Sequence, residues 1–359
     1  MQLTSIEWTD MSWNPIRARR REGGQRVPGH YCEKISSGCA HCYASRTQPR
    51  FGMPQFPGER AGAGGPDVEA FLDEDALNDM LRSRKAGGKK VFVCDMSDLF
   101  GRWVPDEWID LIFAVMALCP QHTFQILTKR PERMADFMAS VSDVRLANAA
   151  NTITRKRGGS LPRGNGDRIF QWPPRNCWLG TSIENQVTAD ERTHHLLHCP
   201  AAVRFLSAEP LLGPIDLRLL PGEADCVQWC IVGGESGPGA RPMHPDWARS
   251  LRDQCQAAGV SFFFKQWGAW MPGTIGGGCD RHVRVMYHDG RLADPNLDPD
   301  AHLNVSLPWV MRPNRDAGGH VMSKVGKKSA GRLLDGREWN EMPAVSGTLP
   351  GVGAEVATT

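Results

Sequence analysis

The middle of the chain repeats one pattern, in which a short run of apolar, mostly β-branched or aromatic residues ends in a group of polar side chains. The runs lie at residues 91–94, 124–127, 177–180, 203–206, 229–232 and 260–264. Apart from one longer gap, their spacing is roughly 25 to 35 residues, which is the length of a βα unit. Continuous apolar runs are typical of strands that are buried on both faces of a parallel sheet. The pattern therefore predicts a parallel sheet.

The segments between these runs carry helix signals. We predict helices over residues 105–119, from 185 to about 198, and over 244–259. Asn185 is suited to the N-cap of the second helix, and Gly259 to the position just after the third. Strands that alternate with helices indicate an α/β fold. We expect a parallel (β/α) barrel of the TIM type, full or partial, over residues 1–270, with an open doubly wound sheet as the alternative.

Other stretches do not follow this pattern. We expect residues 17–31 to form an arginine-rich loop, and residues 146–170 to form a mobile insertion that accounts for the longer gap. A hairpin is predicted where a short apolar run is followed by Asp289 and Gly290. A small β-rich appendage is therefore expected over residues 271–345, followed by a disordered tail at 346–359.

Composition restricts the class of protein. Of the 359 residues, 41% are hydrophobic and 23% are charged, a globular balance that excludes a disordered chain, a coiled coil and a collagen. The longest apolar run, residues 111–119, is far shorter than the roughly 20 residues of a membrane span. Glu7 and Asp10 interrupt the first ten residues, so no secretory signal is expected. We predict a cytoplasmic protein without membrane contact, whose cysteines serve as metal ligands or core residues rather than disulfides.

Three cysteines are clustered. Cys32, Cys39 and Cys42 follow the spacing C-x6-C-x2-C, whereas the other eight cysteines are scattered singly and are expected to be small core residues. Thiolates on one loop converge on a soft metal. These residues leave two interpretations open: an iron–sulfur cluster with one iron left free, or a zinc ion completed by His30 or His41.

The segment from Gly38 to Ala44, with the sequence GCAHCYA, resembles the cluster loop of radical S-adenosylmethionine (SAM) enzymes. The usual spacing in that family is C-x3-C-x2-C, so this chain has a longer first gap. The resemblance implies a [4Fe–4S] cluster held just after the first strand of a partial barrel. It also implies that an electron donor, such as a flavodoxin or ferredoxin, reduces the cluster, which cleaves SAM to a 5′-deoxyadenosyl radical that abstracts hydrogen from a substrate.

A wider resemblance covers nearly the whole chain. It links the chain to a phage-associated, radical-SAM-like family without an assigned reaction, through segments at residues 6–10, 13–15, 95–100, 127–131, 207–214, 233–237, 265–268 and 330–337. This association implies a nucleic acid or a nucleotide as the substrate. The basic segment from Arg17 to Arg26 would then hold phosphate.

Polar residues follow every predicted strand, and in a parallel barrel the carboxyl ends of the strands meet at one mouth. We expect Asp95 and Asp98, at the second strand, to hold the SAM ammonium group, and Gly233, Gly234 and Glu235 to approach the adenosine or the substrate. The complete set of expected cofactor-binding residues is Asp95, Ser97, Asp98, Lys129, Ser182, Glu184, Gly233, Gly234 and Glu235. The expected catalytic residues are Glu209 and Lys265, the latter being one of only ten lysines.

Two other functions compete with this prediction. The first is a non-catalytic nucleic-acid-binding protein with a structural zinc at the same three cysteines. The second is a SAM-independent hydrolase that uses Glu209 and Glu235. Trp8, Trp13 and Trp267 lie near the segments quoted above, where they either stack on a base or pack in the core.

Overall fold

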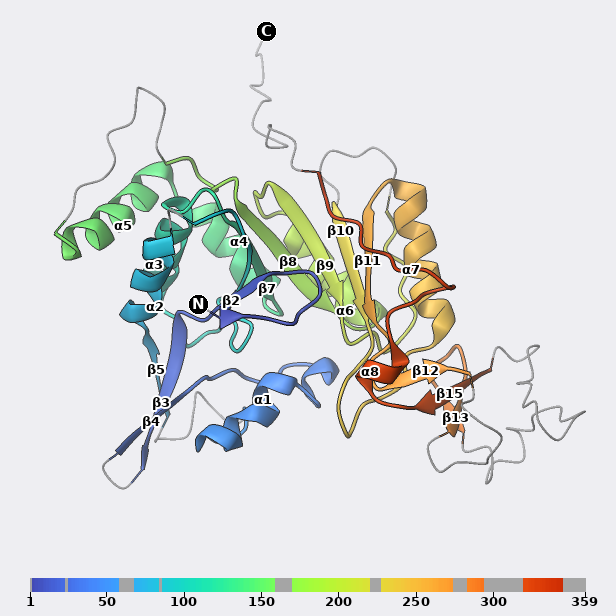
Figure 1. Cartoon of the computed structure of the whole chain (residues 1–359). Coiled ribbons are helices and arrows are strands. Elements are labelled where there is room, and N and C mark those ends of the chain that lie inside the picture. Colours follow the sequence, from blue (N-terminus) through green and yellow to red (C-terminus); the bar gives the residue numbers. More distant parts are fainter. Residues whose placement is uncertain are drawn as a thin grey trace, which may run out of the picture.

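The computed structural model describes residues 2–22, 25–57, 68–83, 86–158, 170–219, 227–273, 283–293 and 319–344. This part of the chain forms a mixed α/β structure with one large sheet and two smaller ones (Figure 1). No helix in these ranges is both long enough and apolar enough to cross a membrane.

The large sheet has eight strands that follow one another in chain order. They are β1 (Gln2–Leu3), β2 (Met11–Trp13), β6 (Lys90–Val93), β7 (Thr123–Thr128), β8 (Cys177–Ile183), β9 (Val203–Ala208), β10 (Trp229–Gly233) and β11 (Ser261–Gln266). β1 is antiparallel to β2, and every other pair of neighbours is parallel. All six predicted apolar runs are strands of this sheet, so the prediction of a largely parallel α/β sheet is confirmed.

The helices between the strands are α2 (Glu74–Arg82), α3 (Asp106–Ala117), α4 (Pro131–Ser140), α5 (Asp143–Lys156), α6 (Gln186–Leu197) and α7 (Pro245–Ala258). α6 packs on β8 and β9 and α7 on β10 and β11, whereas α5 packs on α3. The three predicted helices are confirmed as α3, α6 and α7. The Asn185 side chain accepts a hydrogen bond from Thr188 N in a capping box, and Gly259 ends α7 with a φ of 73°. Local capping chemistry therefore sets these helix boundaries.

Trp8, in the N-terminal segment, packs on the large sheet. The centroid of the Trp8 ring lies 4.7 Å from that of Phe92 and 6.0 Å from that of Trp229, and Trp8 also packs with Phe205. These partners belong to β6, β9 and β10, so one side chain joins three strands that are distant in sequence. Trp8, Trp13 and Trp267 are all buried, which favours the core-packing interpretation for these tryptophans.

The expected arginine-rich loop at residues 17–31 is instead a sheet. β3 (Ile16–Glu22) forms a hairpin with β4 (Gln25–Gly29) and pairs on its other side with β5 (Val68–Leu72). Ile16 and Ala18 are buried while Arg17 and Arg19 alternate with them, which is the period of a half-buried strand. The high charge of this segment suggests a loop, but the alternation of buried and partly exposed residues is that of a strand.

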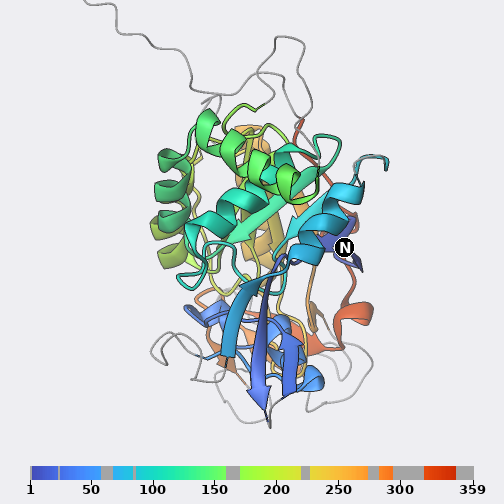
Figure 2. The same ribbon diagram turned by 90° about the vertical axis from the view of Figure 1, so that its left-hand side faces the viewer.

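The C-terminal part forms the third sheet, in the order β12 (Trp270–Pro272), β15 (His320–Lys324), β13 (Val283–Met286), β14 (Leu292–Ala293). The predicted hairpin is confirmed by the antiparallel pairing of β13 with β14, and Gly290 in its turn has a φ of 90°. β12 follows directly from β11, as β3 does from β2, so both smaller sheets lie at the carboxyl end of the large sheet (Figures 1 and 2).

The last described residues return to the large sheet. After the short helix α8 (Lys327–Ala330), the chain runs antiparallel to β11, and Phe264 N donates to Trp339 O at 3.0 Å. Glu341 N donates to Phe262 O at 3.2 Å. This segment therefore covers the outer edge of β11, and does not belong to the small sheet alone.

The predicted insertion at 146–170 begins within α5, whose Leu146, Ala150 and Ile153 are buried against the core. The apolar residues at helical spacing explain this packing, since they outweigh the asparagines between them. The end of the insertion, residues 159–169, and the predicted tail at 346–359 lie outside the described residues.

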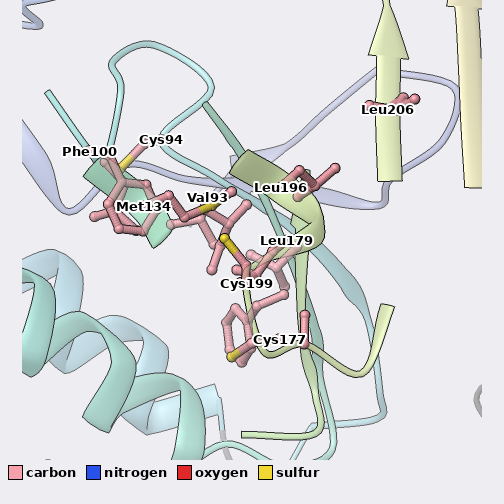
Figure 3. Close-up of a cluster of buried hydrophobic side chains, with 14 of the residues drawn as sticks. Val93, Cys94, Phe100, Met134, Cys177, Leu179, Leu196, Cys199 and Leu206 are labelled. Carbon is pink, nitrogen blue, oxygen red and sulfur yellow. The ribbon is translucent and has the colours of Figure 1, made fainter. Parts of the chain in front are cut away.

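Several of the scattered cysteines are core residues, as expected. Cys94, Cys177 and Cys199 are buried among apolar side chains such as Leu179 and Leu196 (Figure 3). Burial raises the pKa of the Cys199 thiol to about 12, so it is neutral at physiological pH.

Candidate functional site

The cysteine loop, residues 32–42, lies between the first and second parallel strands of the large sheet. It follows the β3–β4 hairpin, contains a short 3-10 helix at Ser37–Cys39, and leads into α1 (Tyr43–Thr47). Cys39 is buried, Cys32 and Cys42 are partly buried, and all three are free thiols. The loop therefore has the place in the chain that the resemblance implies for a cluster loop.

The three thiols interact electrostatically. Removal from water raises the pKa of Cys32, and the negative charges of Asp98, Cys39 and Cys42 raise it further, while Arg130 opposes them. Among the described residues, the only set of three or more His, Cys, Asp or Glu side chains with all ligand atoms within 4.8 Å is elsewhere, at His244. At least one pair of the three cysteine sulfurs is therefore more than 4.8 Å apart, compared with about 3.8 Å for two thiolates on one tetrahedral zinc.

Glu184, directly after β8, anchors the cysteine loop. Its fully buried carboxylate accepts hydrogen bonds from Ser36 Oγ at 2.6 Å, Ser37 Oγ at 3.1 Å and Gly38 N at 2.9 Å. A Cβ on Gly38 would lie 2.5 Å from a Glu184 oxygen, so the loop approaches this closely only with glycine there. Lys129, at the end of β7, forms an ion pair with the same carboxylate.

The protonation state of Glu184 makes this anchor dependent on pH. Burial acts to raise the pKa of Glu184, but Lys129 and the hydrogen bonds from the loop lower it from 4.5 to about 2. A carboxyl group with a lowered pKa in the folded state stabilises the fold above about pH 4.5 and loses this contribution as the pH falls toward 2.

We therefore expect Glu184 to contribute about 3 kcal/mol near neutral pH through this linkage. The measurement is the free energy of unfolding in urea at several values between pH 7 and pH 2.5, for the wild type and Glu184→Gln. The difference between the two proteins should be largest at neutral pH and should shrink through the acid range. A difference that stays constant with pH would contradict the assignment.

A second anchor holds the other end of the cysteine loop. Glu33, next to Cys32, is buried and accepts from Arg102 Nη2 at 2.9 Å and from Arg130 Nη2 at 3.5 Å. Arg130 Nη1 also donates to Asp98 Oδ2 at 2.9 Å. Arg130 thus joins the loop to the ends of β6 and β7. Neither Glu33 nor Arg130 was predicted as a site residue, because an acid beside a loop cysteine has the pattern of ordinary solvated residues.

Asp98 was predicted to bind the SAM ammonium group, but its oxygens are already occupied. It accepts from Thr128 Oγ1 at 2.6 Å, Phe100 N at 3.0 Å and Lys129 N at 3.2 Å, in addition to Arg130. Ser97 Oγ donates to the carbonyl oxygen of Tyr31, the residue before the cysteine loop, at 2.6 Å. Asp98 and Ser97 therefore help to hold the cysteine loop in place.

Asp95 is bound from two sides, with Tyr43 Oη donating to its Oδ2 at 3.4 Å. It accepts from Asn14 Nδ2 at 2.6 Å and lies near the Tyr43 hydroxyl, which donates to Asp95 O at 2.7 Å. Burial raises the pKa of Asp95, although hydrogen bonds from Asn14 and Ser12 oppose this effect. Tyr43 directly follows Cys42, so this contact brings Asp95 to the end of the cysteine loop.

The loop after β10 also closes on the cysteines. Glu235 accepts from Arg241 Nη2 at 2.6 Å, and the same nitrogen donates to Ser37 O at 2.9 Å. A Cβ on Gly239 would lie 2.6 Å from the His41 ring, so the two loops are in close contact. Glu235, predicted to bind cofactor or substrate, therefore positions Arg241 against the cysteine loop.

Gly233 and Gly234 are required by packing. A Cβ on Gly234 would lie 2.1 Å from Trp267 O, and one on Gly233 would lie 3.1 Å from the Glu209 carboxylate. The glycine pair thus lets the ends of β9, β10 and β11 approach one another. The close packing of these strand ends accounts for the two glycines without a bound ligand.

The two predicted catalytic residues are paired. Lys265 Nζ donates to both oxygens of Glu209, at 2.8 and 2.9 Å, and Gln266 Nε2 donates to Glu209 at 3.3 Å. Lys265 shares the inner face of β11 with Phe263, which packs in the Trp8 cluster. The predicted Ser182 is buried on β8 and stands beside Ser207 of β9 in the sheet register.

The predicted residues thus fall into two groups. The carboxylates of Glu184, Asp98 and Glu235 hold the cysteine loop through bonds within the chain. Asp95 and Glu209 form the other group: their charges both raise the pKa of Tyr43, the residue after Cys42. Of the two histidines expected to complete a zinc site, His30 has a pKa lowered by burial to about 4, and His41 packs against Gly239.

Comparison with known proteins gives one match. A family model described as "Protein of unknown function (DUF5131)" matches residues 3–343. No curated protein and no solved structure was found to match the chain. Because the family model spans nearly the whole chain, including the cysteine loop and its anchors, the chain belongs to the DUF5131 family.

Proposed function

We propose that this protein is a radical-SAM-type enzyme that holds a [4Fe–4S] cluster at Cys32, Cys39 and Cys42. The observation that carries the proposal is the site of the cysteine loop. Three free thiols on one loop are held at the carboxyl end of a parallel sheet whose strands follow chain order. We infer that the curved sheet is a partial barrel, with this end as its mouth.

The residues present fit such a cluster. Three free cysteines supply the three thiolates that a cluster with one open iron needs. When bound, the cluster would supply the electron that cleaves SAM reductively. Glu33, paired with Arg102 and Arg130, holds the start of the loop, and Glu184, paired with Lys129, holds its middle.

The chain's own residues would hold SAM next to the open ligand position. Asp95, beside Tyr43, is the acid suited to the ammonium group of SAM, and Lys265 is the cation suited to its carboxylate. Glu209 holds Lys265 in place. The loop after β10, packed on the cysteine loop through Arg241, would exclude water from this region.

The proposed substrate is a nucleic acid or a nucleotide, and the proposed electron donor is a flavodoxin or a ferredoxin. Arg17 and Arg19, once expected to bind phosphate, are paired with Asp73 and Glu69 respectively. Phosphate would therefore be held by other residues, or by Arg17 and Arg19 once they release Asp73 and Glu69.

Anaerobic reconstitution with iron and sulfide, followed by a SAM-cleavage assay, tests the function. We expect a brown protein that absorbs near 400 nm and cleaves SAM when reduced, with the product measured against nucleotides, DNA and RNA. A colourless protein that binds zinc stoichiometrically would support the non-catalytic alternative. Iron loading without any SAM binding would contradict the SAM proposal and leave the cluster assignment intact.

The SAM site gives a separate prediction. Glu209→Gln should keep its fold and its iron but bind SAM ten- to hundredfold more weakly, since Lys265 loses its charged partner and its position. Calorimetric titration of the reconstituted protein with SAM measures the affinity, and thermal unfolding measures the stability. Glu191→Gln, an exposed acid on α6, is the matched control and should change neither. Unchanged affinity in Glu209→Gln would remove this residue from the site.

A further inference from the structure

A group of histidine and aspartate side chains lies away from the cysteine loop, where α7 meets the four-stranded sheet. His244 is the N-cap residue of α7, Asp246 lies in its first turn, and His320 is the first residue of β15. His244 is fully buried, and the other two are partly exposed. Neither the predicted chemistry nor the cysteine site uses any of them.

The three side chains have the geometry of metal ligands. Their ligand atoms all lie within 4.8 Å of one another. Asp246 Oδ2 is 3.3 Å from His320 Nε2 and 3.9 Å from His244 Nδ1. Two nitrogen or oxygen ligands bound at 2.0 to 2.1 Å to a tetrahedral ion lie about 3.3 Å apart, which is the spacing of the Asp246–His320 pair. His244 Nδ1 accepts a hydrogen bond from Asp246 N at 3.2 Å, and binding an ion there would replace that bond.

We propose that His244, Asp246 and His320 bind a transition-metal ion of the zinc class. Two imidazoles and one carboxylate suit zinc, cobalt or iron rather than calcium or magnesium, which prefer oxygen ligands only. Three protein ligands leave a further position for water on the exposed side, which also gives the ion a path of entry. The inference does not depend on the function proposed above.

The surroundings of Asp246 support this site. Arg249 Nη1 donates to Asp246 Oδ1 at 2.8 Å, which orients the carboxylate so that Oδ2 faces the two histidines. Such an outer hydrogen bond to a ligating carboxylate is typical of metal sites.

The position of the site gives the ion a structural role. α7 packs on β10 and β11 of the large sheet, whereas β15 is a central strand of the four-stranded sheet. An ion held by both elements would join the two sheets. α7 and the four-stranded sheet are already in contact here. Trp247 Nε1, on α7, donates a hydrogen bond to His288 O at 2.8 Å, just after β13.

Cobalt titration of the full-length chain tests the proposal. The background protein is His194→Ala/His198→Ala, which removes an exposed histidine pair on α6 that would bind metal without a carboxylate. With Cys32, Cys39 and Cys42 also replaced by alanine in this background, we expect one Co²⁺ per chain and visible d–d absorption without a thiolate charge-transfer band. At 100-fold excess over its dissociation constant, the ion should raise Tm by about 5 °C or more.

Two variants in this background decide the outcome. His320→Ala and Asp246→Asn should each weaken Co²⁺ binding at this site by at least about tenfold and remove the rise in Tm. Should His320→Ala fail to fold, Asp246→Asn, which changes only one charged and partly exposed group, carries the test. Co²⁺ binding and a Tm rise equal to those of the background protein in Asp246→Asn would overturn the proposal.

Discussion

Replacement of Cys32, Cys39 or Cys42 by alanine, one at a time, should abolish iron loading in anaerobic reconstitution. With two thiolates left, the loop cannot hold a cluster that needs three cysteine ligands and one open iron. Iron and acid-labile sulfide per chain, together with absorption near 400 nm, are the measurements. The expected change is from about four irons per chain to almost none.

Two buried cysteines of the large sheet serve as controls. Cys94→Ala and Cys230→Ala remove buried thiols that pack among apolar side chains away from the cysteine loop, so both variants should load iron as the wild type does. They also match the triad variants in the atoms removed. A triad variant that keeps full iron and sulfide would show that the loop is not the cluster site.

Glu184→Gln should destabilise the fold by about 3–5 kcal/mol at neutral pH. Removing one member of a buried ion pair leaves its partner, Lys129, charged without compensation, and Arg192 loses a second partner. The loop hydrogen bonds to Ser36, Ser37 and Gly38 lose their charged acceptor at the same time. The measurement is urea unfolding, and iron loading of the same variant should fall because the loop is no longer held.

Glu74→Gln is the matched control for this variant. Glu74 also pairs with a lysine, Lys156 at 2.8 Å, but both side chains are largely exposed. An exposed pair contributes about 0 to 1 kcal/mol, so this substitution should have little effect on stability or on iron. Equal losses of stability and of iron in the two variants would contradict the role of Glu184 in holding the cysteine loop.

Much of the fold was predictable because its signals are local. Six continuous apolar runs predicted six strands, and capping residues such as Asn185 and Gly259 predicted helix ends. The hairpin at β3 and β4 was missed because the pattern of Ile16 and Ala18 is short and is set among arginines. The start of α5 was missed because asparagine lowered the apparent helical signal.

The candidate site was predictable only in part. The cysteines share one loop and are visible in the sequence, but the contacts that hold this loop join residues far apart in the chain. Glu184 meets Ser36, and Arg241 meets Ser37, through the order in which the strands are arranged. Sequence alone did not distinguish an acid that binds a ligand from one that accepts four or five hydrogen bonds within the protein, because that depends on its neighbours in space.

The coverage of β11 by residues 339–341 has a consequence for synthesis of the chain. A strand edge without a partner is a site for pairing with another molecule. On the ribosome, β11 is complete well before Trp339 and Glu341 emerge, so its outer edge stays bare during that interval. A stop codon near position 330 would make this interval permanent, and we expect such a product to accumulate in inclusion bodies while the longer chain stays in the supernatant.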